Sequence, residues 1–270
     1  MSPFLARRQR FATVGSTNDV VRAWLANGTA EVCLAVADEQ TAGRGRDGRR
    51  WVAPPGAALL LSLGFRPTWL EPADAWRLAA VASLAMAEAG EAVAGLPAGS
   101  IRLKWPNDLA IALGTPGAVR KVAGVLGETE GLGTPDPRVV VGLGINADWA
   151  AGDFPVELAS IMTSLREAGG EREIDMGRLL ERFLEGLEAP VEALRAGRFD
   201  GADWADRQLT TGRTVTLVTA ARVELVRAVG VDTATGALVV EDPSSASGER
   251  RLLAGEISHV RLADPITAAV

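Results

Sequence analysis

The pattern of apolar residues changes near Thr210, and this change constrains how the chain can fold. Before it, apolar runs that suit buried strands alternate with long helical segments at 75–93 and 175–194. After it, residues 213–262 form short alternating stretches separated by turns rich in Gly, Pro and Asp. We therefore expect an α+β core over residues 1–208 and a small β-barrel domain over residues 209–270.

The core segment contains further recognisable elements. A helix is expected after Ser16, because Val20, Val21, Trp24 and Leu25 fall on one helical face. Ser16 or Thr17 suits its N-cap, and a helix N-terminus can also bind an anion. The remaining expected strands are 32–40, 57–65, 101–104, 109–113, 120–128 and 138–146.

One basic stretch, QTAGRGRDGRRW at residues 40–51, is not typical of a structural turn. It holds four arginines, three glycines and one aspartate, so its local charge is four minus one, +3, in a chain of net charge -6. Glycine allows close backbone approach to a ligand, and arginine forks grip phosphate or carboxylate. A solvated basic turn is the alternative. A Walker A loop is excluded, because Gly48 is followed by Arg49, and Pro54 and Pro55 disfavour a helix.

Lysine is rare in this chain. Of 28 basic residues only Lys104 and Lys121 are lysine, which suggests roles that a guanidinium cannot fill. Lys104 lies in IRLKWPNDL, where Asn107 and Asp108 add an amide and a carboxylate at the same strand end, as in ligand pockets. Further on, the Gly-x-Gly before Asn146 allows close backbone approach, but no helix follows promptly, so a dinucleotide fingerprint is not supported.

Composition excludes several classes of function. One cysteine, Cys33, precludes an intrachain disulfide, and it lies in an apolar run typical of a core. One histidine, His259, argues against His-rich metal sites and a Ser-His-Asp triad. No apolar window of about 18 residues predicts a membrane span, and the charged N-terminus does not suit a signal peptide, so a cytoplasmic location is expected. The pI of about 5.1 disfavours electrostatically driven nucleic-acid binding.

Five motifs in fixed order resemble the biotin–protein ligases. They are STN (16–18), QTAGRGRDGRRW (40–51), KWPNDL (104–109), RKVAGVLGE (120–128) and GLGIN (142–146). The resemblance runs from about Thr13 to Asn146, and AGEISHVRL (254–262) is similar to the family's SH3-like barrel. Gly127 departs from it, because a larger aliphatic residue is expected there. Only about 15 residues precede Ser16, so the resemblance suggests a short form without the DNA-binding domain of some members.

The resemblance implies a mixed sheet flanked by helices and a two-step reaction. Biotin and ATP, with Mg²⁺, would form biotinyl-5′-AMP, and a lysine of a biotin carboxyl carrier domain of an acyl-CoA carboxylase would then attack it. Fixed cations, above all Lys121, Arg46 and Arg44, would stabilise negative charge on the phosphate oxygens. The metal ligands cannot be named from the sequence.

The resemblance also assigns two sets of binding residues. Those expected to bind biotin or its adenylate are Ser16, Thr17, Asn18, Gln40, Gly43, Arg44, Gly45, Arg46 and Lys121. Those expected near the nucleotide are Arg49, Trp51, Lys104, Asn107, Asp108 and Asn146.

Two other functions remain open. A lipoate–protein ligase or octanoyltransferase would share the catalytic fold, although the loop motif disfavours it. A non-catalytic biotin or nucleotide sensor would belong to another class, and the full set of cations counts against it.

Overall fold

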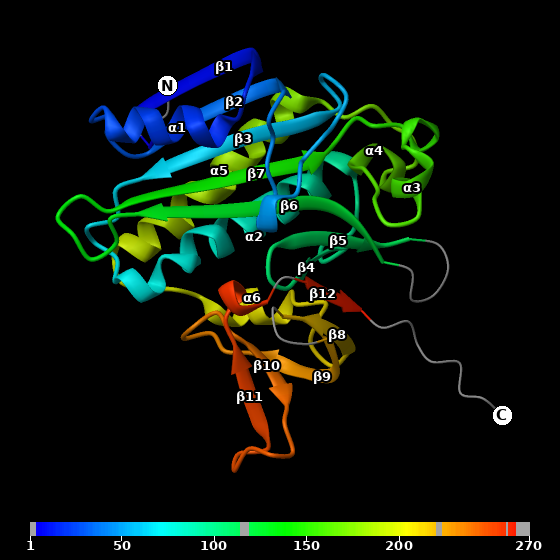
Figure 1. Cartoon of the computed structure of the whole chain (residues 1–270). Coiled ribbons are helices and arrows are strands. Elements are labelled where there is room, and N and C mark those ends of the chain that lie inside the picture. The colour runs from blue at the N-terminus through cyan, green and yellow to red at the C-terminus, as the bar shows by residue number, and fades with distance from the viewer. Residues whose placement is uncertain (1–3, 114–118, 220–222, 258, 263–270) are drawn as a thin grey trace.

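The core of the protein is a seven-stranded mixed sheet. The computed structural model describes residues 4–113, 119–219, 223–257 and 259–262 (Figure 1). The strand order is β1-β2-β3-β7-β6-β5-β4, in which β1 and β2 are parallel and all other neighbours antiparallel. The strands are β1 (Arg7–Val14), β2 (Cys33–Gln40), β3 (Ala58–Phe65), β4 (Ile101–Lys104), β5 (Asp108–Ala112), β6 (Val119–Glu130) and β7 (Arg138–Asn146). The expected mixed sheet is confirmed.

Strand β1 is the one core strand that the sequence does not predict. Its segment, RRQRFATV, is largely exposed and polar, because β1 lies at the edge of the sheet and pairs only with β2. The hydrophobic pattern that reveals the inner strands is therefore weak here. By contrast β3 is buried along its whole length, as its apolar sequence suggests.

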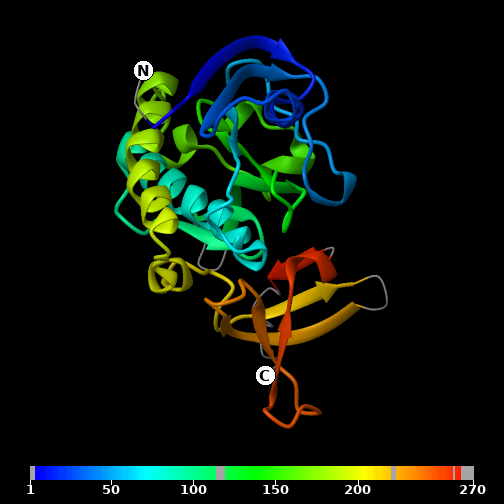
Figure 2. The same cartoon turned by 90° about the vertical axis from the view of Figure 1, so that its left-hand side faces the viewer.

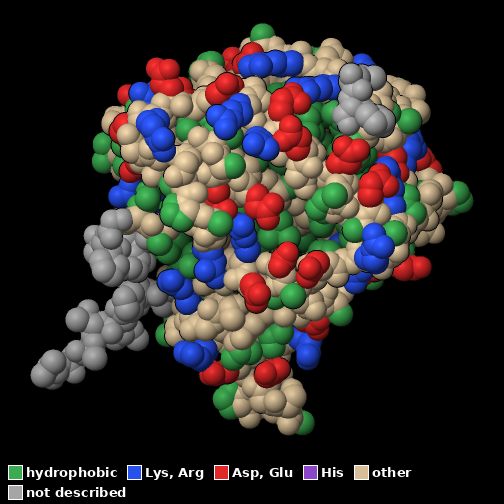
Figure 3. Space-filling view, turned by 180° about the vertical axis from the view of Figure 1, so that it is seen from behind, with side chains coloured by type: hydrophobic (Ala, Val, Ile, Leu, Met, Phe, Trp, Pro, Cys, Tyr) green, Lys and Arg blue, Asp and Glu red, His purple; other side chains and the backbone are tan. Residues whose placement is uncertain are grey.

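Two long helices cover one face of the sheet and a shorter one covers the other (Figure 2). On the first face α2 (Trp76–Ala94) packs against α5 (Met176–Arg195), where Phe183 and Leu187 are fully buried. The carboxylate of Asp175 caps α5, as predicted, by accepting a hydrogen bond from the backbone N–H of Arg178 at 2.9 Å. Seen from behind, this side of the molecule mixes acidic and basic side chains (Figure 3).

The opposite face carries α1 (Thr17–Ala26), which packs against β2, β3 and β7. Its approach to the sheet depends on Gly64, since a Cβ there would lie 2.6 Å from Sγ of Cys33 and from Val21. Cys33 is fully buried, as predicted, and burial raises the pKa of its thiol to about 11. Its thiol is thus a packing group and not a nucleophile.

The C-terminal domain is a five-stranded antiparallel sheet of order β11-β10-β9-β8-β12. Its strands are β8 (Thr214–Val218), β9 (Val223–Val231), β10 (Leu238–Glu241), β11 (Glu249–Leu252) and β12 (His259–Leu262). They agree with the expected small β-domain. The short helices of the chain are α3 (Val156–Ala159), α4 (Leu165–Ala168) and α6 (Gly201–Asp206).

The connection between the two domains is hydrogen-bonded to the core. The backbone N–H of Leu103 donates to Arg207 O at 2.9 Å, and that of Leu209 donates to Leu103 O at 2.7 Å. In addition, Nε1 of Trp105 donates to Gly236 O at 3.0 Å. The chain therefore enters the C-terminal domain along the edge strand β4. Within the described ranges, no helix has the length and apolar character needed to cross a bilayer.

Candidate active site

A cavity of about 280 Å³ lies between the start of α1, the basic Gly/Arg loop (residues 40–51) and the strands β6 and β7. Most residues singled out in the sequence line it. They are Ser16, Thr17, Asn18, Gln40, Arg44, Gly45, Arg46, Arg49, Trp51, Asn107 and Lys121. Gly43, Lys104, Asp108 and Asn146 do not line it. Lys104 nevertheless lies close to Lys121, because both side chains pair with the carboxylate of Asp108.

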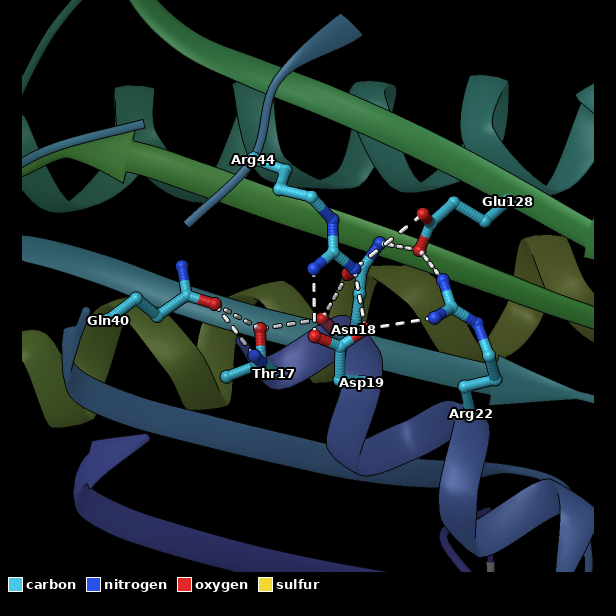
Figure 4. A network of polar contacts seen from close by, with 8 residues as sticks. Thr17, Asn18, Asp19, Arg22, Gln40, Arg44 and Glu128 are labelled. Carbon is cyan, nitrogen blue, oxygen red and sulfur yellow. Dashed lines mark hydrogen bonds and ion pairs between the residues drawn. The ribbon is translucent and has the colours of Figure 1, made fainter. Parts of the chain in front are cut away.

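One end of the cavity is built from neutral polar groups. Oε1 of Gln40 accepts hydrogen bonds from the backbone N–H of Thr17 at 2.7 Å and from its hydroxyl at 3.0 Å (Figure 4). These two bonds fix the amide of Gln40 and leave its Nε2 group as a donor. Ser16 occupies the N-cap position of α1, but its hydroxyl makes no capping bond. The Ser16 hydroxyl can therefore also form a hydrogen bond with a ligand.

A charged network lies beside this end (Figure 4). Arg44 donates to both carboxylate oxygens of Asp19, at 2.8 and 2.6 Å, and these hydrogen bonds hold the pKa of Asp19 below its usual value. Arg22 lies 2.9 Å from Asp19 and 2.8 Å from Glu128. Nδ2 of Asn18 also donates to Glu128, at 2.7 Å. In this structure the Arg44 guanidinium is thus paired with a carboxylate of the protein.

The other end of the cavity is cationic. Nζ of Lys121 lies 2.5 Å from one carboxylate oxygen of Asp108, and Nζ of Lys104 lies 3.4 Å from the other. Burial raises the pKa of Asp108, but the charges of Lys121 and Lys104 outweigh it and leave that pKa below its usual value. Burial lowers the pKa of Lys104. The two rare lysines therefore share one carboxylate, with an excess of one positive charge.

The indole of Trp51 forms part of the cavity wall. It packs against backbone, since a Cβ on Gly144 would lie 2.7 Å from Trp51 and one on Gly124 would lie 3.2 Å from it. Nζ of Lys121 lies 5.3 Å from the ring centroid, within the range of a cation–π contact. In the same way Gly142 makes room for Asn18, because a Cβ there would collide with Oδ1 of the amide. The two glycines of the Gly-x-Gly sequence thus allow the side chains of Asn18 and Trp51 to lie directly against β7.

Arg46 links the Gly/Arg loop to the C-terminal domain. Its Nη2 donates to the carbonyl oxygens of Ala254 and Ile257, both at 2.6 Å, and burial lowers its pKa. The loop turns sharply after it, where Asp47 and Gly48 both have positive φ. This contact joins residues that are more than 200 positions apart and could not be seen in the sequence.

Asn107 and Asn146 differ in where they lie. Asn107 lines the cavity, and its Nδ2 donates to Val125 O at 3.1 Å. Asn146 is fully buried, and its Nδ2 donates to Thr163 O at 3.0 Å. Its Oδ1 has no hydrogen-bond partner among the described residues. Thr163 in turn is held beside the cavity, since its backbone N–H donates to Lys121 O at 2.8 Å.

Several residues of the site were not singled out from the sequence. Ser62 is buried beneath the cavity, and its hydroxyl lies 2.7 Å from Thr17 Oγ1 and 2.5 Å from Asn18 Oδ1. It is the single polar residue in the run AALLLSLGF, a signal that could have been read. Glu128 could also have been found, because it alternates along β6 with Gly124 and Leu126 and so shares their face. No sequence pattern of this kind marks Asp19 as part of the site.

The chain is similar to a known protein family over much of its core. Residues 11–146, which run from within β1 to the end of β7, match the biotin/lipoate A/B protein ligase family. The chain belongs to that family. The biotin–[acetyl-CoA-carboxylase] ligase of Mycobacterium tuberculosis is 36% identical over 79% of this chain and 73% of the relative. The bifunctional ligase/repressor BirA of Bacillus spizizenii is 34% identical over 63% of this chain, which spans about half of that relative (49%).

The fold of the family is also found in solved structures. The biotin protein ligase from Aquifex aeolicus, in complex with biotin and ATP, superposes with a TM-score of 0.76 at 27% identity. The match covers 95% of this chain and 99% of that one, so it includes the C-terminal sheet as well as the core.

Proposed function

We propose that this protein is an ATP-dependent ligase that activates biotin as biotinyl-5′-AMP and transfers it to a lysine of a biotin carboxyl carrier domain. The observation that carries the proposal is the polarity of the cavity. One end offers neutral groups, the hydroxyl of Ser16 and the amide of Gln40, while the other offers the ammonium of Lys121. Biotin has the matching form, with a neutral ureido ring at one end and a carboxylate at the other.

Both steps of the reaction need fixed positive charge near Lys121. In the first step a biotin carboxylate oxygen attacks the α-phosphorus of ATP, and the bond to pyrophosphate breaks. In the second the acceptor ε-amine attacks the acyl carbon, loses its proton, and AMP leaves. Negative charge grows on phosphate oxygens in the first step, and a preorganised cation stabilises it. Lys121 supplies that cation, positioned by Asp108 at 2.5 Å.

Magnesium is proposed to arrive with ATP. Among the described residues, no group of three or more His, Cys, Asp or Glu side chains could form a metal site of the protein's own. Nearby carboxylates are already paired, Asp108 with two lysines and Glu128 with Arg22. Mg²⁺ commonly binds through substrate phosphates and water, so MgATP is treated as the substrate. We place the reaction in the cytoplasm, where ATP and carboxylases are available.

Biotin-dependent exchange of labelled pyrophosphate into ATP tests the first step. We expect exchange with biotin and none without it. A sensor that binds biotin without catalysis would give no exchange, and that result would overturn the proposal.

Transfer to a carrier domain distinguishes the two kinds of ligase in the family. The protein, MgATP and a biotin carboxyl carrier domain should yield biotinylated carrier, measured by the mass increase of the intact domain. A parallel reaction with lipoate and a lipoyl domain should give no product. Labelling with lipoate alone would favour the lipoate ligase alternative.

A further inference from the structure

We propose that Asp19 and Glu128 are positioning residues that preorganise the neutral end of the biotin cavity. This inference rests on the proposed function, because it assigns that end to the ureido ring. Neither carboxylate is expected to touch biotin. They act through Arg44 and Asn18, whose polar groups they engage.

The first part of the argument is a closed ring of charges. Asp19 pairs with Arg44 and Arg22, Arg22 pairs with Glu128 at 2.8 Å, and Glu128 lies 3.7 Å from Arg44. Two carboxylates and two guanidinium groups cancel in charge, so the ring attracts no net counter-ion. It joins the helix α1, the strand β6 and the first arginine of the Gly/Arg loop (Figure 4). Arg44 therefore fixes the loop to α1 at the point where the loop enters the cavity.

The second part is the amide of Asn18, which is only 5% exposed. Its Nδ2 donates to the Glu128 carboxylate at 2.7 Å, so its Oδ1 must face the hydroxyl of Ser62, which donates to it at 2.5 Å. The amide lies directly against Gly142, where a Cβ would collide with Oδ1. Both of its ends are engaged by the protein. Asn18 thus holds the start of α1 in place.

The residues at this end of the cavity therefore have two roles: some contact the ligand and others hold those residues in position. Ser16 and Gln40 keep polar groups that no described residue engages, and their positions depend on the start of α1, which the ring and Asn18 hold. Losing Asp19 or Glu128 should weaken binding of the ring end of biotin. It should leave the chemistry at Lys121, at the other end of the cavity, almost unchanged.

The test uses the full chain and titration calorimetry without ATP. The variants are Asp19→Asn, Glu128→Gln, Arg44→Gln and the double variant Asp19→Asn/Arg44→Gln. The matched control is Asp136→Asn, another carboxylate whose pKa an arginine lowers, placed in the exposed β6–β7 connection away from the cavity. The ligands are biotin and biotinol, which has the same ring but an alcohol in place of the carboxylate.

Each single variant should raise Kd for biotin about five- to tenfold, as expected for lost charged hydrogen bonds. The same factor should appear with biotinol, because the effect lies at the ring end. The double variant should bind no worse than Asp19→Asn alone, since the two residues act as a pair. In the exchange assay of Asp19→Asn and Glu128→Gln, KM for biotin should rise while kcat changes less than about twofold.

The proposal is overturned if Asp19→Asn and Glu128→Gln bind biotin like wild type, or if the penalties of Asp19→Asn and Arg44→Gln add. A rise in Kd that appears only with biotin would also overturn it. Should Glu128→Gln fail to fold, Asp19→Asn still tests the proposal. The Asp19 side chain is half-exposed, so its replacement should not prevent folding. Failure of the wild-type protein to bind biotin at all would instead refute the proposed function.

Discussion

Lys121 shows why a single residue type can matter at this site. Its Nζ lies 2.5 Å from Asp108 and 5.3 Å from the Trp51 ring, and a Cβ on Gly124 would lie 3.0 Å from it. A compact ammonium fits this space, whereas a planar guanidinium is wider and needs several acceptors in fixed directions. In a chain with 26 arginines, a lysine occupies position 121, where the neighbouring groups leave little space for the side chain.

Replacing Lys121 with arginine should therefore impair the first step although the charge is kept. We expect the rate of biotin-dependent pyrophosphate exchange to fall by about 100-fold, comparable to the loss of one well-placed donor. Arg138→Lys, on a half-buried side chain at the start of β7 that does not line the cavity, is the control for a general effect of exchanging the two cations. Near-normal exchange by Lys121→Arg would contradict this explanation of lysine's rarity.

Asp108 should make stability depend on acid pH. Burial raises its pKa, but Lys121 and Lys104 outweigh burial and leave it below 3.8. A carboxyl with a depressed pKa contributes stability that is complete above its unfolded pKa and is lost as pH falls through its folded pKa. The difference in unfolding free energy between wild type and Asp108→Asn should thus be constant near neutrality and shrink below about pH 4. Urea denaturation at a series of pH values measures it, and a constant difference down to pH 3 would refute it.

At the scale of elements, the site depends on how closely α1 and Trp51 approach β6 and β7. Gly142 and Gly144 lie on the face of β7 toward the cavity, and each leaves space that a neighbouring side chain fills. Gly127 in β6 is different, because a Cβ there would meet nothing within 4 Å. The sequence marks Gly127 as a departure from the family pattern, and the structure shows that it is no part of the cavity wall.

Gly142→Ala and Gly127→Ala form a matched pair. In Gly142→Ala the new methyl group collides with Asn18, so we expect a loss of about 1–3 kcal/mol in unfolding free energy and weaker biotin binding. Gly127→Ala should leave both properties close to wild type. Thermal unfolding and calorimetry compare the two variants. Equal behaviour would show that the close approach of Asn18 is not needed.

At the scale of the whole molecule, the C-terminal segment contacts the core at the Gly/Arg loop. Arg46 donates to Ala254 O and Ile257 O, so the position of the loop over the cavity is coupled to the C-terminal sheet. The edge strand β4 and Trp105 add hydrogen bonds at the same junction. A junction held by these hydrogen bonds would favour retention of an unstable intermediate, because closing the loop excludes water.

Arg46→Gln should shorten that retention. Losing two hydrogen bonds from a charged donor should raise the release rate of biotinyl-AMP about tenfold or more. Release can be followed by trapping the free adenylate after a single turnover. Arg251→Gln, which removes an exposed arginine paired with Asp232 within the C-terminal domain, should not change the rate. An unchanged rate in Arg46→Gln would mean that the domain contact does not hold the loop.

Elements with strong local patterns could be predicted from the sequence, and long-range pairings could not. The inner strands and both long helices follow from apolar periodicity, while the exposed edge strand β1 has almost none. The motifs located the cavity residues. They could not show that Arg44 pairs with Asp19 or that Arg46 reaches Ala254, because an arginine's partner is set by tertiary contact. The domain boundary at 208/209 stays a prediction.

The sharing of Asp108 by both lysines has a consequence for chemical self-modification. An acyl adenylate reacts with any unprotonated amine, and an arginine guanidinium stays protonated and does not compete. Lys104 and Lys121 are the only ε-amines of the chain, and both are ion-paired to one carboxylate. An intermediate that escapes therefore finds few targets on the enzyme that made it. The same scarcity should confine amine-reactive dyes and cross-linkers, among lysines, to these two positions beside the cavity.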